Sequence, residues 1–110
     1  MKSVCVAMKE EFARSESVCA QTLMLFHLIS NKARFRIICL LTRGDFCVQD
    51  IADVVAHGNL SNISQQLKIL RLAGLIDRRR DDRKLIYHLK DERVRTMIGF
   101  LRDQFLGVTP

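Results

Sequence analysis

The sequence predicts a mainly helical domain with a small β-hairpin, an α+β architecture of five helices and two strands. Three observations predict it. Apolar residues recur at intervals of three and four over most of the chain, which is the spacing of helices with one buried side. A helix beginning near residue 60 has a polar side of small hydrogen-bonding groups. A glycine and two short strand-like runs with a basic tip follow it, and this order is typical of a winged helix-turn-helix fold.

The composition limits the class of protein. A chain of 110 residues forms one domain, small enough that pairing with a second copy would bury additional apolar surface. Apolar content of 48% argues against disorder, and a net charge of +6 favours an anionic partner without deciding between DNA, RNA and a lipid surface. No stretch reaches the roughly 20 uncharged apolar residues of a membrane span, and the charged N-terminus lacks the core of a signal peptide. We therefore expect a cytoplasmic protein with no membrane partner.

Residues 3–29 are expected to form one long helix, because they contain neither proline nor glycine. Its seam follows a 3-4 alternation, the spacing of a helix that packs against another helix. The seam consists of Cys5, Met8, Phe12, Ser15, Cys19, Thr22, Phe26 and Ile29. We expect residues 1–30 to be an N-terminal dimerisation helix that crosses its counterpart in a second subunit.

A second helix is expected over residues 32–43, buried on most sides. Its inner stripe consists of Phe35, Ile38, Cys39 and Thr42. A third helix is expected within residues 46–56. The tight connection at His57 and Gly58 then predicts a helix-turn-helix over residues 46–73.

The helix after this turn is the candidate for contacting DNA. Asn59 can cap its start, and Gly74 can end it in a left-handed conformation. Its apolar stripe consists of Leu60, Ile63, Leu67 and Leu70. The opposite side has small hydrogen-bonding groups and one cation, which suit base edges and phosphates. The candidate DNA-binding residues there are Ser61, Asn62, Ser64, Gln65, Gln66 and Lys68.

Residues 75–89 are expected to form the wing. Two strand-like runs, residues 75–80 and 84–88, are separated by two aspartates and Arg83, which suit a turn. Five cations in this hairpin favour contact with phosphates or with the minor groove. Alternate residues of a strand face opposite ways, so not all five can touch DNA. We place Arg79 and Arg83 at the tip as the DNA-binding candidates.

The last helix is expected over residues 91–108. Its apolar stripe consists of Val94, Met97, Ile98, Leu101 and Phe105. Other functions fit the pattern less well. The helix and hairpin also suit an ordinary small α+β domain, or a winged-helix module for protein interaction that has lost DNA binding, but the polar side lacks the acidic residues that would favour such a module. No nucleophile motif, Gly-rich phosphate loop or recognisable carboxylate pair suggests an enzyme, and we expect none.

The four cysteines, Cys5, Cys19, Cys39 and Cys47, include no C-x-x-C pair. A structural zinc site and structural disulfides are therefore not expected. Most of the four are expected to be buried small hydrophobes.

Three segments carry a resemblance to a known family: residues 31–35 (NKARF), 64–67 (SQQL) and 72–76 (LAGLI). Over about residues 20–106 the chain resembles the ArsR/SmtB winged-helix repressors. The resemblance implies a homodimer joined through the first and last helices, which binds a double-stranded DNA operator of two-fold symmetry and leaves it when an inducer acts. Two recognition helices would enter major grooves about one helical turn apart.

A metal or metalloid ion is one inducer that the resemblance offers. Metal-responsive members have a Glu-Leu-Cys-Val-Cys-Asp box, where this chain has residues 45–50 (DFCVQD) and lacks one thiolate. Cys47 and a second subunit's Cys5 remain a weak candidate pair. At the family's last-helix site Asp91 is kept. The other three places hold Arg93, Gln104 and Gly107. An arginine there repels a cation, and no further cofactor is expected.

A thiol-reactive signal is the other inducer. Cys39 matches the first cysteine of the family's persulfide and oxidant sensors, but Leu106 stands at the second, so their intrachain bridge cannot form. Cys39 could be oxidised alone or pair with Cys19, although its apolar neighbours also fit an inert buried thiol. We therefore expect a repressor released by a thiol-reactive or a metal or metalloid signal. A regulator that senses neither is the alternative.

Overall fold

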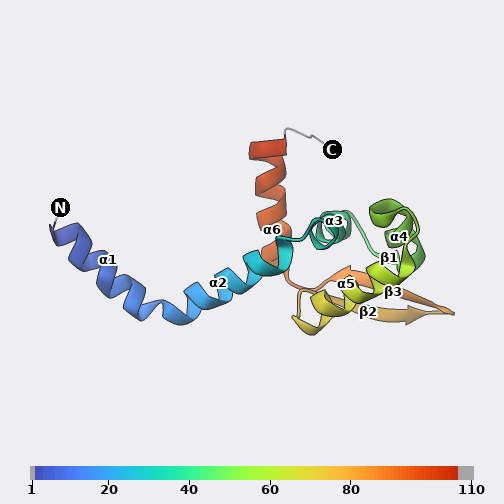
Figure 1. Ribbon diagram of the computed structural model, residues 1–110, viewed down its shortest axis with the longest axis horizontal. Coiled ribbons are helices and arrows are strands. Elements are labelled where there is room, and N and C mark those ends of the chain that lie inside the picture. The colour runs from blue at the N-terminus through green and yellow to red at the C-terminus, as the bar shows by residue number, and fades with distance from the viewer. Residues whose placement is uncertain (1, 107–110) are drawn as a thin grey trace. The chain divides into compact units, whose positions relative to one another are not determined.

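A computed structural model describes residues 2–106 (Figure 1). The chain divides into two compact units, Met1–Ser30 and Asn31–Pro110. The boundary falls at the break expected after the N-terminal helix. In the described part there are six α-helices rather than the expected five, because the first expected helix is divided.

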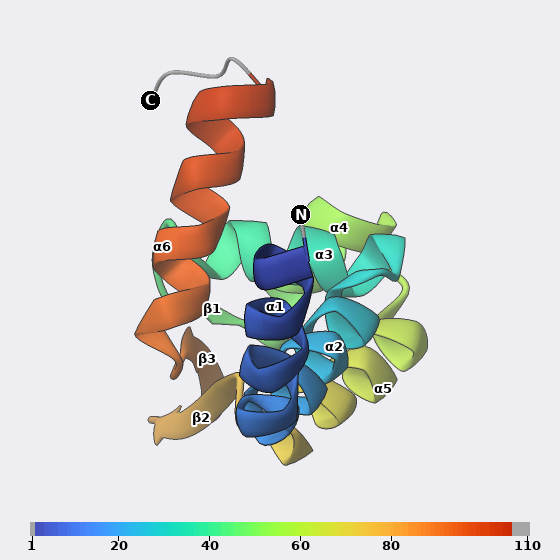
Figure 2. The same ribbon diagram turned by 90° about the vertical axis from the view of Figure 1, so that its left-hand side faces the viewer.

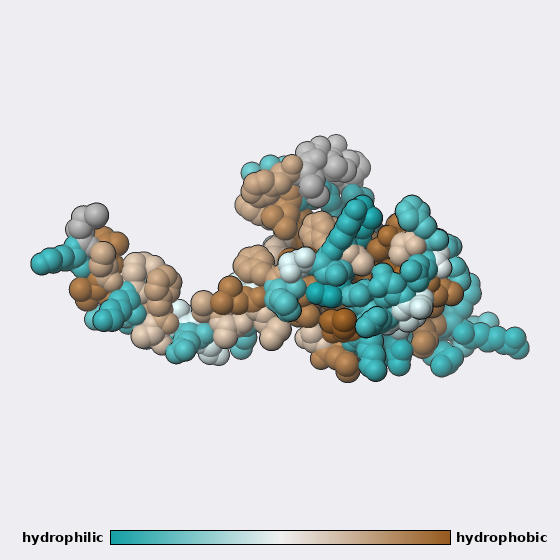
Figure 3. Space-filling model, viewed as in Figure 1, coloured by the Kyte–Doolittle hydropathy of each residue, from teal (hydrophilic) through white to brown (hydrophobic). Residues whose placement is uncertain are grey.

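The first unit consists of α1 (Lys2–Arg14) and α2 (Glu16–Ile29). The expectation of one continuous helix was wrong at Ser15, whose φ of −105° and ψ of 20° leave the helical region. The Ser15 hydroxyl donates to the Glu11 carbonyl at 2.8 Å, and a serine bonded back in this way bends a helix. No described residue of α1 is buried, and Figure 3 shows hydrophobic side chains along this unit.

The core of the second unit lies between α3 (Lys32–Leu41), α4 (Val48–Ala56) and α5 (Leu60–Leu72). Its most deeply buried side chains include Ile37, Ile38, Leu41, Ile51, Ala52, Ile63, Leu67 and Leu70. The expected inner stripe of α3 was partly wrong. Phe35 and Thr42 are only half-buried, whereas Ile37 and Leu41 are fully buried.

The connection between α4 and α5 is as short as expected. His57 (φ 52°) and Gly58 (φ 86°) are both left-handed. The Asn59 side chain then accepts a hydrogen bond from the Asn62 backbone N–H at 3.3 Å, which confirms the expected cap. At the other end of α5, Gly74 has a φ of 84°, a conformation that favours glycine.

The sheet has three antiparallel strands in the order β1-β3-β2. The strands are β1 (Phe46–Cys47), β2 (Ile76–Asp81) and β3 (Lys84–Leu89). The expected wing had only the last two. β1 was missed because it is two residues long and pairs with β3, forty residues later in the chain, where no local pattern indicates it. Figure 1 shows the β2–β3 hairpin projecting beyond the helices of the second unit, with its turn at the far end.

The last helix is shorter than expected. α6 (Glu92–Leu101) is followed by a π-helical segment, η1 (Arg102–Leu106), and the expected residues 107 and 108 lie outside the described part. Asp91 caps α6 by accepting a hydrogen bond from the Arg93 backbone N–H at 3.0 Å. The views in Figures 1 and 2 agree that the later part of α6 and η1 extends beyond the other elements of the second unit. None of the helices between residues 2 and 106 has the length and apolarity needed to cross a membrane.

Packing of α5 is expected to dominate the stability of the second unit. Leu67→Ala should lower the free energy of unfolding by about 2–5 kcal/mol, because Leu67 is fully buried and its truncation leaves a cavity. Leu72→Ala is the matched control on the same helix, since Leu72 is 70% exposed, and its effect should stay below about 0.5 kcal/mol. Urea denaturation of both variants measures the difference. Equal losses would mean that α5 does not pack as described.

Candidate nucleic-acid interface

The polar side of α5 faces outward. Ser61, Ser64, Gln65 and Lys68 are exposed, whereas Ile63, Leu67 and Leu70 on the other side are fully buried. Burial of each of these three apolar side chains is worth about 1.5–3 kcal/mol, so the helix cannot rotate to hide its polar side. α5 therefore presents a row of short hydrogen-bonding groups and one ammonium group at the surface.

Two of the expected contact residues are half-buried and bonded to their neighbours. Gln66 Oε1 accepts a hydrogen bond from Arg34 Nη1 on α3 at 2.9 Å, and Gln66 Nε2 donates to Asn62 Oδ1 at 3.3 Å. Both ends of the Gln66 amide are thus engaged, and this chain of bonds ties α5 to α3. Sequence reasoning did not single out Arg34, because its partner lies 32 residues away and nothing local marks the pair.

The turn of the wing consists of Asp82 and Arg83, with Asp82 in a left-handed conformation at φ 59°. Arg83 is exposed at this turn, as expected. The expectation that Arg79 lies at the tip was wrong, because Arg79 is inside β2 opposite Ile86. Its guanidinium pairs with the Asp45 carboxylate at 2.9 Å. Asp45 directly precedes β1, so this pair spans the central strand β3.

The other basic residues of β2 lie on the opposite face from Arg79, since strand residues alternate. Arg78 is paired with Tyr87 and donates from Nη1 to the Tyr87 hydroxyl at 3.3 Å. Arg80, opposite Leu85, is exposed and was not among the expected contact residues. Figure 3 shows hydrophilic side chains gathered at the end of the hairpin.

The cysteines differ in exposure. Cys5 and Cys19 are exposed in the first unit, Cys47 is buried and Cys39 is half-buried. Burial raises the pKa of the Cys39 thiol above its ordinary value, and the positive charge of Arg102 offsets part of this rise. Within the described residues no group of three or more His, Cys, Asp or Glu side chains is placed to hold a metal ion.

The carboxylate at the start of α6 is already occupied. Arg93 donates from Nε to Asp91 Oδ1 at 3.0 Å and from Nη2 to Oδ2 at 2.8 Å. This hydrogen bonding holds the pKa of Asp91 below its usual range. Gln104 is exposed on η1, and Gly107 lies outside the described residues. Asp91 thus serves as a helix cap with an arginine partner.

Comparison with known proteins identifies relatives. A profile of the family described as "Bacterial regulatory protein, arsR family" matches residues 31–78. An uncharacterized HTH-type transcriptional regulator of Mycobacterium tuberculosis is 32% identical over 77 residues, which cover 70% of this chain and 68% of that protein. The biofilm growth-associated repressor of Xylella fastidiosa is 27% identical over 77 residues, covering 70% of this chain and 67% of the repressor.

A solved structure is similar over most of the fold. It is the solution structure of a homodimeric winged helix-turn-helix DNA-binding domain from Mycobacterium bovis, a possible ArsR-family regulator. The TM-score is 0.69 at 26% sequence identity, over 84% of this chain and 88% of that one.

The reactivity of Cys39 is expected to be low at neutral pH. Its raised pKa leaves less thiolate, the reactive form, so iodoacetamide should modify Cys39 more slowly than the exposed Cys5 at pH 7. The rate at which iodoacetamide modifies Cys39 should rise about tenfold per pH unit until the pH reaches the raised pKa, because the thiolate fraction grows in that proportion. Peptide mapping by mass spectrometry at several pH values measures both rates. Preferential modification of Cys39 at pH 7 would contradict the expected burial effect.

Proposed function

We propose, because this chain belongs to the ArsR family of bacterial regulatory proteins, that it acts as a homodimer that binds a double-stranded DNA operator and represses transcription. The chain is a transcriptional regulator and not an enzyme, like the proteins that it matches. The observation that carries the proposal is the exposed polar side of α5 next to a hairpin with a basic turn.

Base contacts are assigned to the middle of α5. Gln65 and Ser64 are exposed there, and a glutamine can donate to and accept from the edge of an adenine in the major groove. Lys68, one turn further along, suits a phosphate. Asn62 and Gln66 are assigned a supporting role, since their amides are bonded to each other and to Arg34.

Contacts with the phosphate backbone of DNA are assigned to the wing. Arg83 at the turn and Arg80 beside it are exposed cations within the described hairpin, and sequence-independent affinity comes mainly from such cations. Arg79 is assigned a different role: its pair with Asp45 fixes the hairpin to the segment before β1. An exposed pair of this kind contributes little to stability but orients the strand.

Dimerisation is assigned to the first and last helices. Large apolar side chains are exposed on α1, α2 and the α6–η1 region, and a small monomer rarely leaves so many open. They are Val4, Val6, Met8, Phe12, Val18, Leu23, Met24, Phe26, Phe100 and Phe105. The M. bovis relative is described as homodimeric, which supports the same state here. A two-fold dimer would offer two copies of α5 to one duplex.

The proposed repressor leaves its operator in response to a chemical signal. A thiol-reactive signal would act at Cys39, which lies half-buried on α3 in the same unit as α5, and it would act slowly at neutral pH because burial raises the pKa of this thiol. A metal or metalloid signal through Cys47 has less support, because Cys47 is buried. Operator release tested with a persulfide donor, peroxide, arsenite and zinc, on the intact chain and with each cysteine changed to serine, separates these signals.

DNA binding is expected to divide between affinity and sequence preference. Arg83→Ala should weaken binding to the DNA upstream of the chain's own operon and to an unrelated duplex alike, and should reduce the slope of log affinity against log salt by about 1. Arg79→Ala is the matched control and should have a smaller effect, because Asp45 already holds that guanidinium. Gln65→Ala should cost about 1–3 kcal/mol on the operator and leave the unrelated duplex unchanged.

Fluorescence anisotropy with labelled duplexes measures these affinities. Equal effects of Gln65→Ala on both duplexes would exclude a base contact. Absence of binding to any duplex by the intact chain would favour the protein-interaction module instead.

The dimer is expected to depend on the exposed phenylalanines. Phe26→Glu and Phe100→Glu should each raise the dimer dissociation constant at least about tenfold, since a charge would be placed in an apolar interface. Leu72→Glu is the control, because Leu72 is also exposed but lies on α5. Sedimentation velocity over a range of concentrations distinguishes them. A monomer at all concentrations in the intact chain would refute the dimer.

A further inference from the structure

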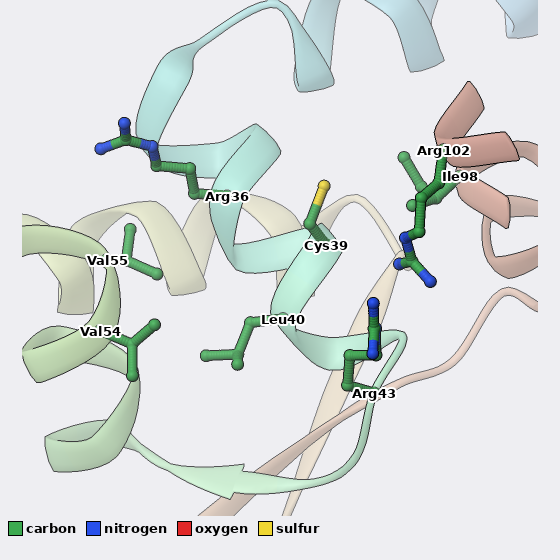
Figure 4. A pocket seen from close by; sticks show the side chains of 8 residues that line it. All are labelled: Arg36, Cys39, Leu40, Arg43, Val54, Val55, Ile98 and Arg102. Carbon is green, nitrogen blue, oxygen red and sulfur yellow. The ribbon is translucent and has the colours of Figure 1, made fainter. Parts of the chain in front are cut away.

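A pocket of about 460 Å³ lies between α3, α4 and the α6–η1 region of the second unit (Figure 4). Its apolar wall is formed by Leu40, Val54, Val55 and Ile98. Cys39 also lines it, and burial keeps this thiol in its neutral form, so it adds to the apolar surface. The volume is within the range of small-molecule sites, about 300–1,000 Å³.

One side of the pocket is cationic. Arg43, after α3, and Arg102, on η1, both line it, and Figure 4 shows their guanidinium groups pointing toward each other. Arg102 Nη2 donates to Thr42 Oγ1 at 3.1 Å, which anchors this side chain next to Arg43. Within residues 2–106 neither arginine forms an ion pair with a carboxylate. Two like charges that converge without a counter-charge leave a place for an anion.

Arg36 contrasts with this pair. It also lines the pocket, but its guanidinium points away from Arg43 and Arg102 in Figure 4. It lies on α3, as does Cys39, so it provides a matched arginine in the same region.

We propose that this pocket binds a small organic carboxylate with an apolar body. The carboxylate is held between Arg43 and Arg102, since guanidinium groups bind its two oxygens in a fixed planar geometry. The apolar body covers Leu40, Val54, Val55 and Ile98, which inorganic phosphate would leave bare. Such a ligand contacts α4, which leads into α5, and also α6. If the proposed DNA-binding function holds, a ligand that binds one position of the recognition helix more tightly than another shifts the chain toward that position.

Isothermal titration of the full chain tests the site without DNA, so its outcome does not depend on the proposed function. The probes are octanoate and phenylacetate, their uncharged amides, and inorganic phosphate. We expect at least one carboxylate to bind at least tenfold more tightly than its amide and than phosphate. Arg43→Gln and Arg102→Gln should each weaken that carboxylate at least tenfold, while Arg36→Gln should change its affinity less than twofold.

Several outcomes would overturn the proposal. They are no binding of either carboxylate, amides or phosphate that bind as well as the carboxylates, and an equal loss of affinity in all three arginine variants. Circular dichroism melts accompany each titration. If the Arg102→Gln variant unfolds because it loses its bond to Thr42, the affinity of the Arg43→Gln variant alone tests the proposal. That substitution removes no hydrogen bond, since none of the Arg43 side chain is found within the described residues.

Discussion

Burial of one side of α5 is the constraint on which the rest of this protein depends. Ile63, Leu67 and Leu70 are fully enclosed by α3, α4 and β2, so rotating the helix would expose all three at once. The opposite side is therefore held at the surface in a fixed orientation. Asn59 and Gly74 limit the helix at its ends, and the Arg34–Gln66 bond adds a polar attachment to α3. A surface fixed in this way suits recognition better than one on a mobile loop, because less conformational entropy is lost on binding.

The orientation of the wing is likewise fixed by burial of one side of an element, in this case β3. β3 is the central strand, paired with β2 on one side and with the two-residue β1 on the other. Tyr87 and Leu89 bury one face of it in the core, and this fixes which arginines of β2 face each way. Arg79 is directed to Asp45 and Arg78 to Tyr87, whereas Arg80 and the turn residue Arg83 stay exposed.

The net charge of the chain favours an anionic partner, and the structure shows that its arginines have different surroundings. Some are bonded within the protein, such as Arg34 to Gln66 and Arg93 to Asp91. Arg83 is exposed at the turn of the wing. Arg43 and Arg102 line the pocket, with their guanidinium groups pointing toward each other. The separation of bonded from unbonded cations follows from which carboxylates and amides the fold brings near them.

The sequence by itself determined the winged helix-turn-helix class, the bounds of α5, its Asn59 cap and its outward polar side, because these follow from helical periodicity and from interactions within four residues. Only the tertiary structure decided which polar residues are engaged. The Arg34–Gln66 and Asp45–Arg79 contacts and the pairing of β1 with β3 join residues more than thirty positions apart, and the pocket brings α3 and α4 together with the equally distant α6. The break at Ser15 was also missed, since a hydroxyl that bonds back to the helix is not visible in an apolar pattern. Local patterns fix local structure, whereas contacts between distant residues depend on how the elements pack.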